Sequence, residues 1–199
     1  MKVSEALLKR RSIKAYDTEI TLSEDEIRTL LSLALETPSS FNIQHWRLCA
    51  VTDPGVRKQI SEAAWNQAHL REAPLVVAIA ADPKAWKDAE RYWRNSSPEV
   101  QAKMAGMIRQ FYQEERLQRD EAIRSGSLLA MSLMLAATER GWDTCPMIGF
   151  DPVKVKQILA MPEDWIPVML VTVGKGVKPA HPKSGQMPYE EIVFRDSFV

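Results

Sequence analysis

The chain has 199 residues, of which 45% are hydrophobic and 26% are charged. This composition is sufficient for one domain to bury a core, and it excludes a disordered chain. Lysine plus arginine and aspartate plus glutamate number 26 each, so no net charge attracts nucleic acid or an anionic membrane surface. We therefore expect a small-molecule substrate, no nucleic-acid or membrane partner, and a single domain over residues 1–199.

The cysteines and the N-terminus predict where the protein works. Cys49 and Cys145 are too few for a disulfide framework or a zinc site. The first residues enter an amphipathic pattern without a secretion signal, and the longest apolar runs are too short to cross a bilayer. These features predict reduced thiols and a cytoplasmic protein.

Helices and strands alternate in the first part of the chain. Ser23 and Glu26 form a capping box, which predicts the start of a helix that Pro38 limits. Asp53 followed by Pro54 is typical of another helix start. The expected elements are a helix at 3–9, a helix at 24–36, a strand at 46–52 and a helix at 54–64.

The middle of the chain contains a buried strand and a charged segment. Residues 75–81 are apolar on both faces, which favours the middle of a sheet covered by helices. Residues 84–124 are densely charged but retain aromatic side chains, so we expect a helical excursion from the core. These helices are either ordinary surface helices or a mobile cover over a ligand.

The last third begins with a segment, 125–140, that has almost no polar face. Such a helix is central or is shared with a second subunit. A helix at 151–161 and a strand at 166–173 follow, and residues 177–199 remain as a C-terminal arm. The interleaved helices and strands, taken alone, favour a layered α/β arrangement that leans towards parallel strands.

A polar turn precedes the first strand. Between Pro38 and Arg47 the chain reads Pro-Ser-Ser-Phe-Asn-Ile-Gln-His-Trp-Arg. Its amides each carry a donor and an acceptor, which suit the edge of a polar heterocycle. A plain solvated turn has the same composition.

Three further segments carry binding chemistry. The run 10–14 offers cations that match phosphate oxygens, although basic residues also complement the end of a helix. Asn66-Gln67 is a second amide pair, or a helix cap. In the run 145–150, Gly149 permits a close approach of the backbone to a ligand, or the run is a tight turn. Lys183 lies in a Pro/Gly-rich segment near the end of the chain.

Several common sites are not indicated. The chain has no Gly-x-Gly-x-x-Gly after a strand, no P-loop and no Gly-x-Ser-x-Gly elbow. Its three histidines lack metal-ligand spacing. We therefore expect no metal and no serine nucleophile.

Taken in order, five motifs closely resemble those of the FMN-dependent nitroreductase family, and the similarity spans nearly the whole chain. The motifs are Arg10-Arg11-Ser12-Ile13-Lys14-Ala15-Tyr16, Pro38-Ser39-Ser40-Phe41-Asn42-Ile43-Gln44, Asn66-Gln67, Pro146-Met147-Ile148-Gly149-Phe150 and Val173-Gly174-Lys175-Gly176. The resemblance implies an α+β fold with a central, mostly antiparallel sheet flanked by helices. It also implies an intertwined homodimer with FMN at the subunit interface.

The resemblance also implies roles for individual residues. Arg10, Ser12 and Lys183 would hold the FMN phosphate, and Lys14 would lie near the N1–O2 edge of the flavin. Gln67 or Asn66 would address the pyrimidine, and backbone N–H groups at 148–149 would reach N5. The polar turn would come from the other subunit. The expected cofactor-binding residues are Arg10, Arg11, Ser12, Lys14, Pro38, Ser39, Ser40, Asn42, Gln44, Asn66, Gln67, Met147, Ile148, Gly149 and Lys183.

Two positions depart from the family pattern. Gln44 is followed by His45 where many relatives have proline. The place of a second C-terminal cation is taken by Gly185, so either phosphate affinity is weaker or Arg11 or Lys175 substitutes for that cation.

The implied activity is a two-step hydride transfer through FMN from NADH or NADPH to nitroaromatic or quinone acceptors, with no side-chain acid or base required. Two alternatives remain open: a narrow metabolite reaction on the same fold, such as reductive dehalogenation or dehydrogenation, and a flavin-binding sensor or storage protein with slow turnover.

Overall fold

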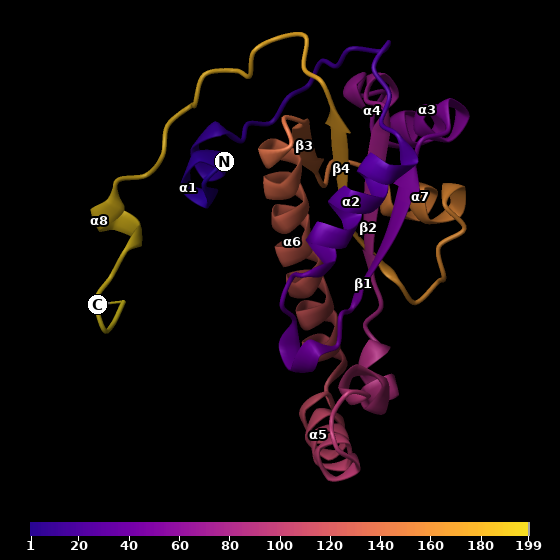
Figure 1. Cartoon of the computed structure of the whole chain (residues 1–199), viewed down its shortest axis with the longest axis vertical. Coiled ribbons are helices and arrows are strands. Elements are labelled where there is room, and N and C mark those ends of the chain that lie inside the picture. Colours follow the sequence, from indigo (N-terminus) through magenta and orange to yellow (C-terminus); the bar gives the residue numbers. More distant parts are fainter. Residues whose placement is uncertain (199) are drawn as a thin grey trace.

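A computed structural model describes residues 1–198 as a four-stranded sheet with helices on both faces (Figure 1). The strands are β1 (Trp46–Val51), β2 (Leu75–Ala81), β3 (Asp143–Met147) and β4 (Ile166–Gly174). The helices are α1 (Val3–Lys9), α2 (Glu24–Leu35), η1 (Ser40–Asn42), α3 (Pro54–Ala63), α4 (His69–Glu72), η2 (Ala85–Trp93), α5 (Pro98–Phe111), α6 (Glu115–Glu139), α7 (Pro152–Ile158) and α8 (Tyr189–Ile192), of which η1 and η2 are 3₁₀ helices.

The strand order is β1-β2-β4-β3, and each neighbouring pair is antiparallel. The α+β prediction from the family resemblance is confirmed, whereas the parallel-leaning prediction from element order is wrong. Burial on both faces is typical of parallel sheets. Here helices cover both faces of an antiparallel sheet, so burial does not distinguish the two arrangements.

The alternation of β2 divides the core into two layers. All seven residues of β2 are buried, and Val77 and Ile79 point to the layer formed with α2 and α6. Val76 and Ala78 point to the opposite layer, formed with α3, α4 and α7. The predicted central position of this strand is confirmed, and its alternate residues hold both helical layers.

The central helix α6 is longer than the sequence predicts. It has 25 residues and begins at Glu115, so residues 115–124 belong to it and not to the excursion. The sequence does not predict that residues 115–124 belong to this helix, because its first turns are charged and the apolar pattern starts only near Leu128. At Gly126 the helix approaches the sheet closely, since an added Cβ would lie 3.1 Å from Val168.

The sequence does not predict β3. Pro146 lies inside this strand, where proline is disfavoured because it cannot donate to the ladder. It is tolerated because β3 is the edge strand of the sheet: its ladder is with β4, and on its other side the described chain contributes an isolated bridge between Ser12 and Thr144.

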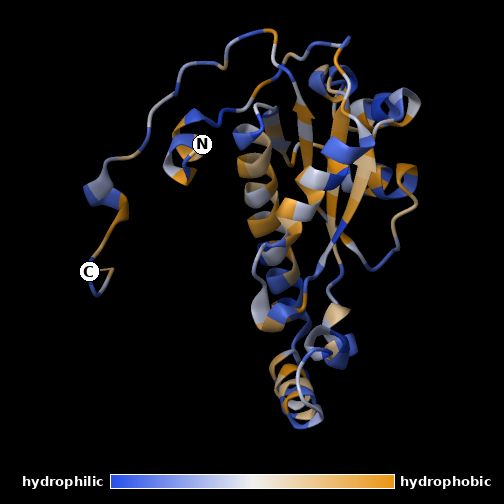
Figure 2. Ribbon diagram, viewed as in Figure 1, coloured by the Kyte–Doolittle hydropathy of each residue, from blue (hydrophilic) through white to orange (hydrophobic). Residues whose placement is uncertain are grey.

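The excursion formed by η2 and α5 lies beyond one end of the sheet (Figure 1). Tyr112, Ile108 and Ala89 form a separate apolar cluster there with Ile43, next to the polar turn. The C-terminal arm leaves the body at the opposite end (Figure 1). Figure 2 shows hydrophobic positions along the arm, and several are exposed: Met187, Tyr189, Ile192, Phe194 and Phe198. Among residues 1–198, none of the helices combines the length and apolar character that crossing a membrane requires.

Candidate functional site

The N-terminal basic segment runs beside edge strand β3. Arg10 ends α1, and the chain then continues extended, with Ser12 in a parallel bridge to Thr144. The backbone N–H of Ile13 donates to the oxygen of Thr144 at 3.0 Å. Because Ile13 is buried, the alternation of an extended chain leaves Ser12 and Lys14 exposed on the other side.

The thiol of Cys145 marks where these polar groups converge. Burial raises the pKa of Cys145, while Lys14, a hydrogen bond with Ser12, and Arg10 act in the opposite direction. All three side chains are therefore close to the middle of β3. A raised pKa leaves a neutral thiol at pH 7, so Cys145 is a packing residue and not a nucleophile.

Two polar atoms near this segment lack partners. Within the described chain, Arg10 Nη1 and Thr144 Oγ1 are buried and make no hydrogen bond. Both residues line a small cavity of about 30 Å³ together with Arg11 and Trp142. Buried donors are rarely left unpaired, so each of these atoms is free to bind a group that residues 1–198 do not supply.

The turn after α3 meets the loop after β3. The side-chain nitrogen of Gln67 donates to the backbone oxygen of Gly149 at 3.1 Å. The ring of Trp65 lies against the same glycine, since an added Cβ would be 3.2 Å from Trp65 Cζ3. Asn66 is exposed and has a positive φ of 59°. This places Gln67, Asn66, Ile148 and Gly149 together, as the family resemblance predicts.

His69 joins this turn to the basic segment. Its Nε2 lies 3.3 Å from Met147 Sδ, and burial together with the charge of Lys14 lowers its pKa. His69 is therefore neutral at pH 7. Sequence reasoning did not select it, because a lone histidine without ligand spacing carries no signal; the buried contact with Met147 is visible only in the fold.

The C-terminal arm returns to the basic segment. Arg11 donates a hydrogen bond to the backbone oxygen of His181, and Ala180 packs against Ile13 and Tyr16. Lys183 follows two residues later, within about 7 Å of chain from His181. Lys175 also lies near this segment: its Nζ is 4.1 Å from the centre of the Trp142 ring and donates to Gly141, and both of these residues line the same small cavity as Arg10 and Arg11.

The polar turn lies elsewhere, at the excursion end of the sheet. Ser39 Oγ accepts from the N–H of Gln44 at 2.9 Å, and Gln44 Nε2 donates to Asn42 Oδ1 at 3.1 Å. Phe41, Asn42 and Gln44 all have positive φ, between 51° and 58°. Such backbone strain in residues other than glycine is common at ligand sites.

Packing holds this strained turn in place. Trp93 Nε1 donates to the oxygen of Phe41, and Asn42 Nδ2 donates to the oxygen of Tyr92, each at 3.2 Å. His45 is fully buried and lies 3.0 Å from the oxygen of Asp82 through Nδ1. The excursion therefore supports the turn directly.

The predicted residues thus form two groups. The first combines Arg10, Arg11, Ser12, Lys14, Asn66, Gln67, Met147, Ile148 and Gly149, with Lys183 nearby on the arm. The second consists of Pro38, Ser39, Ser40, Asn42 and Gln44. The aromatic contacts of Phe41 with Phe111 and Tyr112 place the second group beyond the start of α6, whereas β3 follows its end. The two groups thus lie towards opposite ends of α6, a helix about 37 Å long, although Thr37, beside Pro38, contacts Ser132 of this helix at 2.7 Å.

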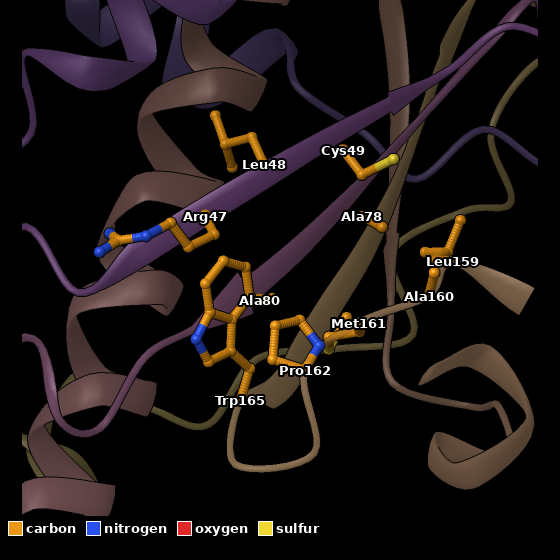
Figure 3. Close-up of a pocket in the computed structure, with 10 residues that line it drawn as sticks. All are labelled: Arg47, Leu48, Cys49, Ala78, Ala80, Leu159, Ala160, Met161, Pro162 and Trp165. Atoms are coloured by element: carbon orange, nitrogen blue, oxygen red, sulfur yellow. The ribbon is translucent and has the colours of Figure 1, made fainter. Parts of the chain in front are cut away.

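A separate cavity of about 110 Å³ lies beside β1 and β2 (Figure 3). Its lining is largely apolar, including Leu48, Ala78, Leu159 and Pro162, and its only cationic side chain, Arg47, lies over the ring of Trp165. None of the predicted site residues lines it. Within residues 1–198, histidine, cysteine and carboxylate side chains form no group of three or more suited to a metal ion.

Comparison with known proteins identifies the class. A model of the nitroreductase family matches residues 7–175. The chain belongs to the nitroreductase family, whose members are oxidoreductases. It is 43% identical to the protein DrgA of Synechocystis sp. over 90% of this chain and 87% of that protein. It is 33% identical to an NADH dehydrogenase of Thermus thermophilus over 94% of this chain and 93% of the relative.

A solved structure gives the same fold. The crystal structure of a protein from Exiguobacterium sibiricum in complex with FMN is 28% identical and superposes with a TM-score of 0.91, covering 98% of this chain and 97% of that one. The recognition of the family from the five sequence motifs is confirmed.

Proposed function

We propose that the protein is an FMN-dependent oxidoreductase that uses NADH or NADPH to reduce nitroaromatic, quinone or related small acceptors. The observation that carries this proposal is the convergence of the first group of residues at edge strand β3. Cations, amides and an accessible glycine from four distant parts of the sequence meet there. Membership of the family and the FMN complex of the relative support the same assignment.

The donor chemistry of this cluster fits FMN. Arg10 has a buried Nη1 without a partner, and a guanidinium matches phosphate oxygens. Ser12 and Lys183 would complete the phosphate site, with Arg11 as the additional cation. An unmade hydrogen bond of a buried donor costs about 1–3 kcal/mol, so the free protein gains stability when an acceptor binds to Arg10.

Other residues fit the ring system. Lys14 would lie near the N1–O2 edge, where its charge stabilises the anionic reduced flavin. Gln67 or Asn66 would bind the pyrimidine edge. Gly149 has no side chain of its own beside its N–H, and the hydrogen bond from Gln67 to the Gly149 oxygen holds the following peptide in place, so the loop would present the N–H groups at 148–149 to N5.

Bound FMN supplies hydride transfer in two steps, in which NAD(P)H gives two electrons and the acceptor takes two electrons and two protons. The chain itself positions the ring, holds a cation at its anionic edge and binds the phosphate. His69 and Cys145 are both neutral at pH 7, so neither adds charge to the site. No side-chain acid or base is assigned, and protons come from water.

We further propose that the protein acts as a homodimer in which the polar turn of each copy completes the site of the other. Within one chain the two groups lie towards opposite ends of α6. An apolar groove of about 220 Å³ lies between α1, α2 and α6, where Leu33, Leu135 and Val3 line it. Leu128 and Leu8 are also exposed on these helices. Continuous exposed apolar surface of this kind favours a protein partner, and a second copy brings the missing turn.

Three smaller proposals accompany this one. Residues 1–199 act as one nitroreductase-like domain. The excursion over residues 84–114 covers the acceptor bound at the partner's site, because it packs on the polar turn. The protein is cytoplasmic, in keeping with two free cysteines, one of them exposed.

Anaerobic reduction followed by reoxidation tests the function. Mixing the FMN-loaded protein with NADH or NADPH is expected to bleach the flavin, and a quinone is expected to restore it within one turnover. Steady-state rates are expected to give parallel double-reciprocal lines. A flavin that neither nicotinamide bleaches contradicts the proposal. A flavin that is reduced but reoxidised slowly by every acceptor favours a sensor, and rapid reoxidation by only one metabolite favours a narrow reaction.

A further inference from the structure

Trp65 is an exposed indole on a strained turn. Its side chain is 71% exposed, and it has a φ of 54°, followed by 59° at Asn66. Asparagine adopts positive φ relatively often, but a bulky residue such as Trp65 does so rarely. Because neither the backbone nor the hydrophobic effect favours this arrangement, its persistence suggests a function.

Hydrogen bonds on both sides fix the turn. The N–H of Asn66 donates to the oxygen of Ser61 at 2.8 Å, and Ser61 Oγ donates to the oxygen of Gln67 at 2.9 Å. Arg71 Nη1 donates in turn to Ser61 Oγ at 2.7 Å. The turn is therefore well determined, and Trp65 is held in one place.

The indole is directed to the candidate site. An added Cβ at Gly149 would lie 3.2 Å from Trp65 Cζ3, and the neighbouring Ile148 is 74% exposed. Trp65 and Ile148 thus flank Gly149 as an apolar rim, next to the amide of Gln67. The rim residues themselves offer no cation for phosphates, unlike the Arg10–Lys14 end of the cluster.

We propose that Trp65 is a specificity-determining residue that holds planar aromatic electron acceptors against its indole. This inference rests on the proposed function and names the acceptor class that the site prefers. Aromatic rings gain from offset or edge contacts beyond their buried area. A compact uncharged ring suits an apolar rim, whereas a dinucleotide needs partners for its phosphates. Trp65 therefore acts on the acceptor half-reaction and not on reduction by NAD(P)H.

The test compares W65G with A160G. Glycine adopts the positive φ of position 65 without strain, so W65G removes the ring and preserves the turn. Ala160 is exposed with a φ of 46° and lies outside the cluster, so A160G relieves similar strain without removing a ring. Calorimetric titration of oxidised FMN-loaded protein with 4-nitrobenzyl alcohol measures binding without turnover.

We expect the dissociation constant of 4-nitrobenzyl alcohol to rise about tenfold in W65G and to stay unchanged in A160G. The KM of this acceptor is expected to rise in parallel, whereas flavin reduction by NADH and turnover with ferricyanide keep their wild-type rates. W65F is expected to recover most of the affinity, and W65L, which has no ring, is expected to recover little.

An unchanged affinity of W65G for 4-nitrobenzyl alcohol overturns the inference. A W65G variant whose flavin is no longer reduced by NADH, but whose acceptor affinity is normal, overturns it as well. If W65G does not fold, wild-type affinity in W65L overturns the inference instead. Failure of the proposed function looks different, because wild-type protein would then bind no FMN or would not be reduced by NADH.

Discussion

The side chain of Gln67 donates a 3.1 Å hydrogen bond to the backbone oxygen of Gly149, which joins the turn after α3 to the loop after β3. These segments are 82 residues apart in sequence, and both carry motifs of the nitroreductase family. The bond fixes the peptide that joins Gly149 to Phe150, so the geometry of the candidate flavin site depends on a side chain from another element.

We expect Q67A to weaken FMN binding about tenfold, because it removes this bond and one amide contact with the ligand. Its free energy of unfolding should fall by only about 0.5–1.5 kcal/mol. Fluorescence titration of the FMN-free protein and urea unfolding measure the two effects. Q59A, on an exposed position of α3, is the control, and equal FMN affinity in both variants would contradict the role of Gln67.

Arg10 should show opposite effects on binding and stability. R10M removes a charged donor to phosphate, which is worth about 1.5–3 kcal/mol, or roughly 10- to 150-fold in FMN affinity. The FMN-free protein should be as stable as wild type or more stable, because Nη1 has no partner among the described residues. R28M, at an exposed position of α2, should leave both quantities unchanged. An R10M variant that loses stability but keeps its affinity would show that Arg10 is structural.

The contact between Tyr16 and Gly174 predicts a stability effect. A Cβ at position 174 would lie 2.8 Å from Tyr16 Cδ1 and 2.8 Å from Pro74 Cδ. G174A should therefore cost about 1–3 kcal/mol of unfolding free energy through overpacking. G106A, in open space on α5, should instead gain about 0.5–1 kcal/mol from helix propensity. Thermal or urea unfolding that ranks the two variants in the other order would refute this packing.

Buried histidines make the fold sensitive to acid. Burial lowers the pKa of His45 and of His69 below the ordinary 6.5, so both stay neutral in the native state. Below about pH 6.5 the unfolded chain binds more protons than the native protein, and the free energy of unfolding falls with pH by up to about 1.4 kcal/mol per unit per histidine. H69Q should reduce this slope, because it removes one of the two histidines whose pKa burial lowers. Urea midpoints between pH 5 and 8 measure the slope of the unfolding free energy against pH. A wild-type midpoint that does not change with pH would contradict this prediction.

The exposed apolar side of α6 tests the homodimer. L128E places a carboxylate on the proposed interface, where an unpaired buried charge costs about 3–5 kcal/mol. Light scattering after gel filtration should show a monomer, and FMN affinity should fall because the partner's polar turn is lost. V153E, at another exposed apolar position, on α7, is expected to remain dimeric and to bind FMN. A dimeric L128E with full affinity would locate the interface elsewhere.

Local patterns predicted most elements of this fold. The helix over 3–9 and the strand over 75–81 have the predicted bounds, because an amphipathic pattern followed by charge marks the helix and flanking prolines mark the strand. The sequence does not predict edge strand β3, because Pro146 is a residue that strands disfavour. The antiparallel order depends on how distant strands pair, and this pairing has no local signal; the family resemblance supplied it.

The candidate site was predicted in part. The cations at 10–14 are predicted from their match to phosphate oxygens and the amides at 66–67 from their paired donors and acceptors, and the fold brings them together at β3. Trp65 and His69 were missed, since an isolated aromatic residue or histidine is usually a packing residue. Their roles depend on contacts with Gly149 and Met147, which lie about 80 residues away in the sequence.

The central claim is that the residues gathered at β3 bind FMN. The most direct measurement is the visible absorbance of the purified protein, before and after FMN is added and unbound flavin is removed by gel filtration. The account predicts a yellow protein that retains one FMN per chain in the wild type and much less in R10M. A wild-type protein that stays colourless after exposure to FMN would contradict it.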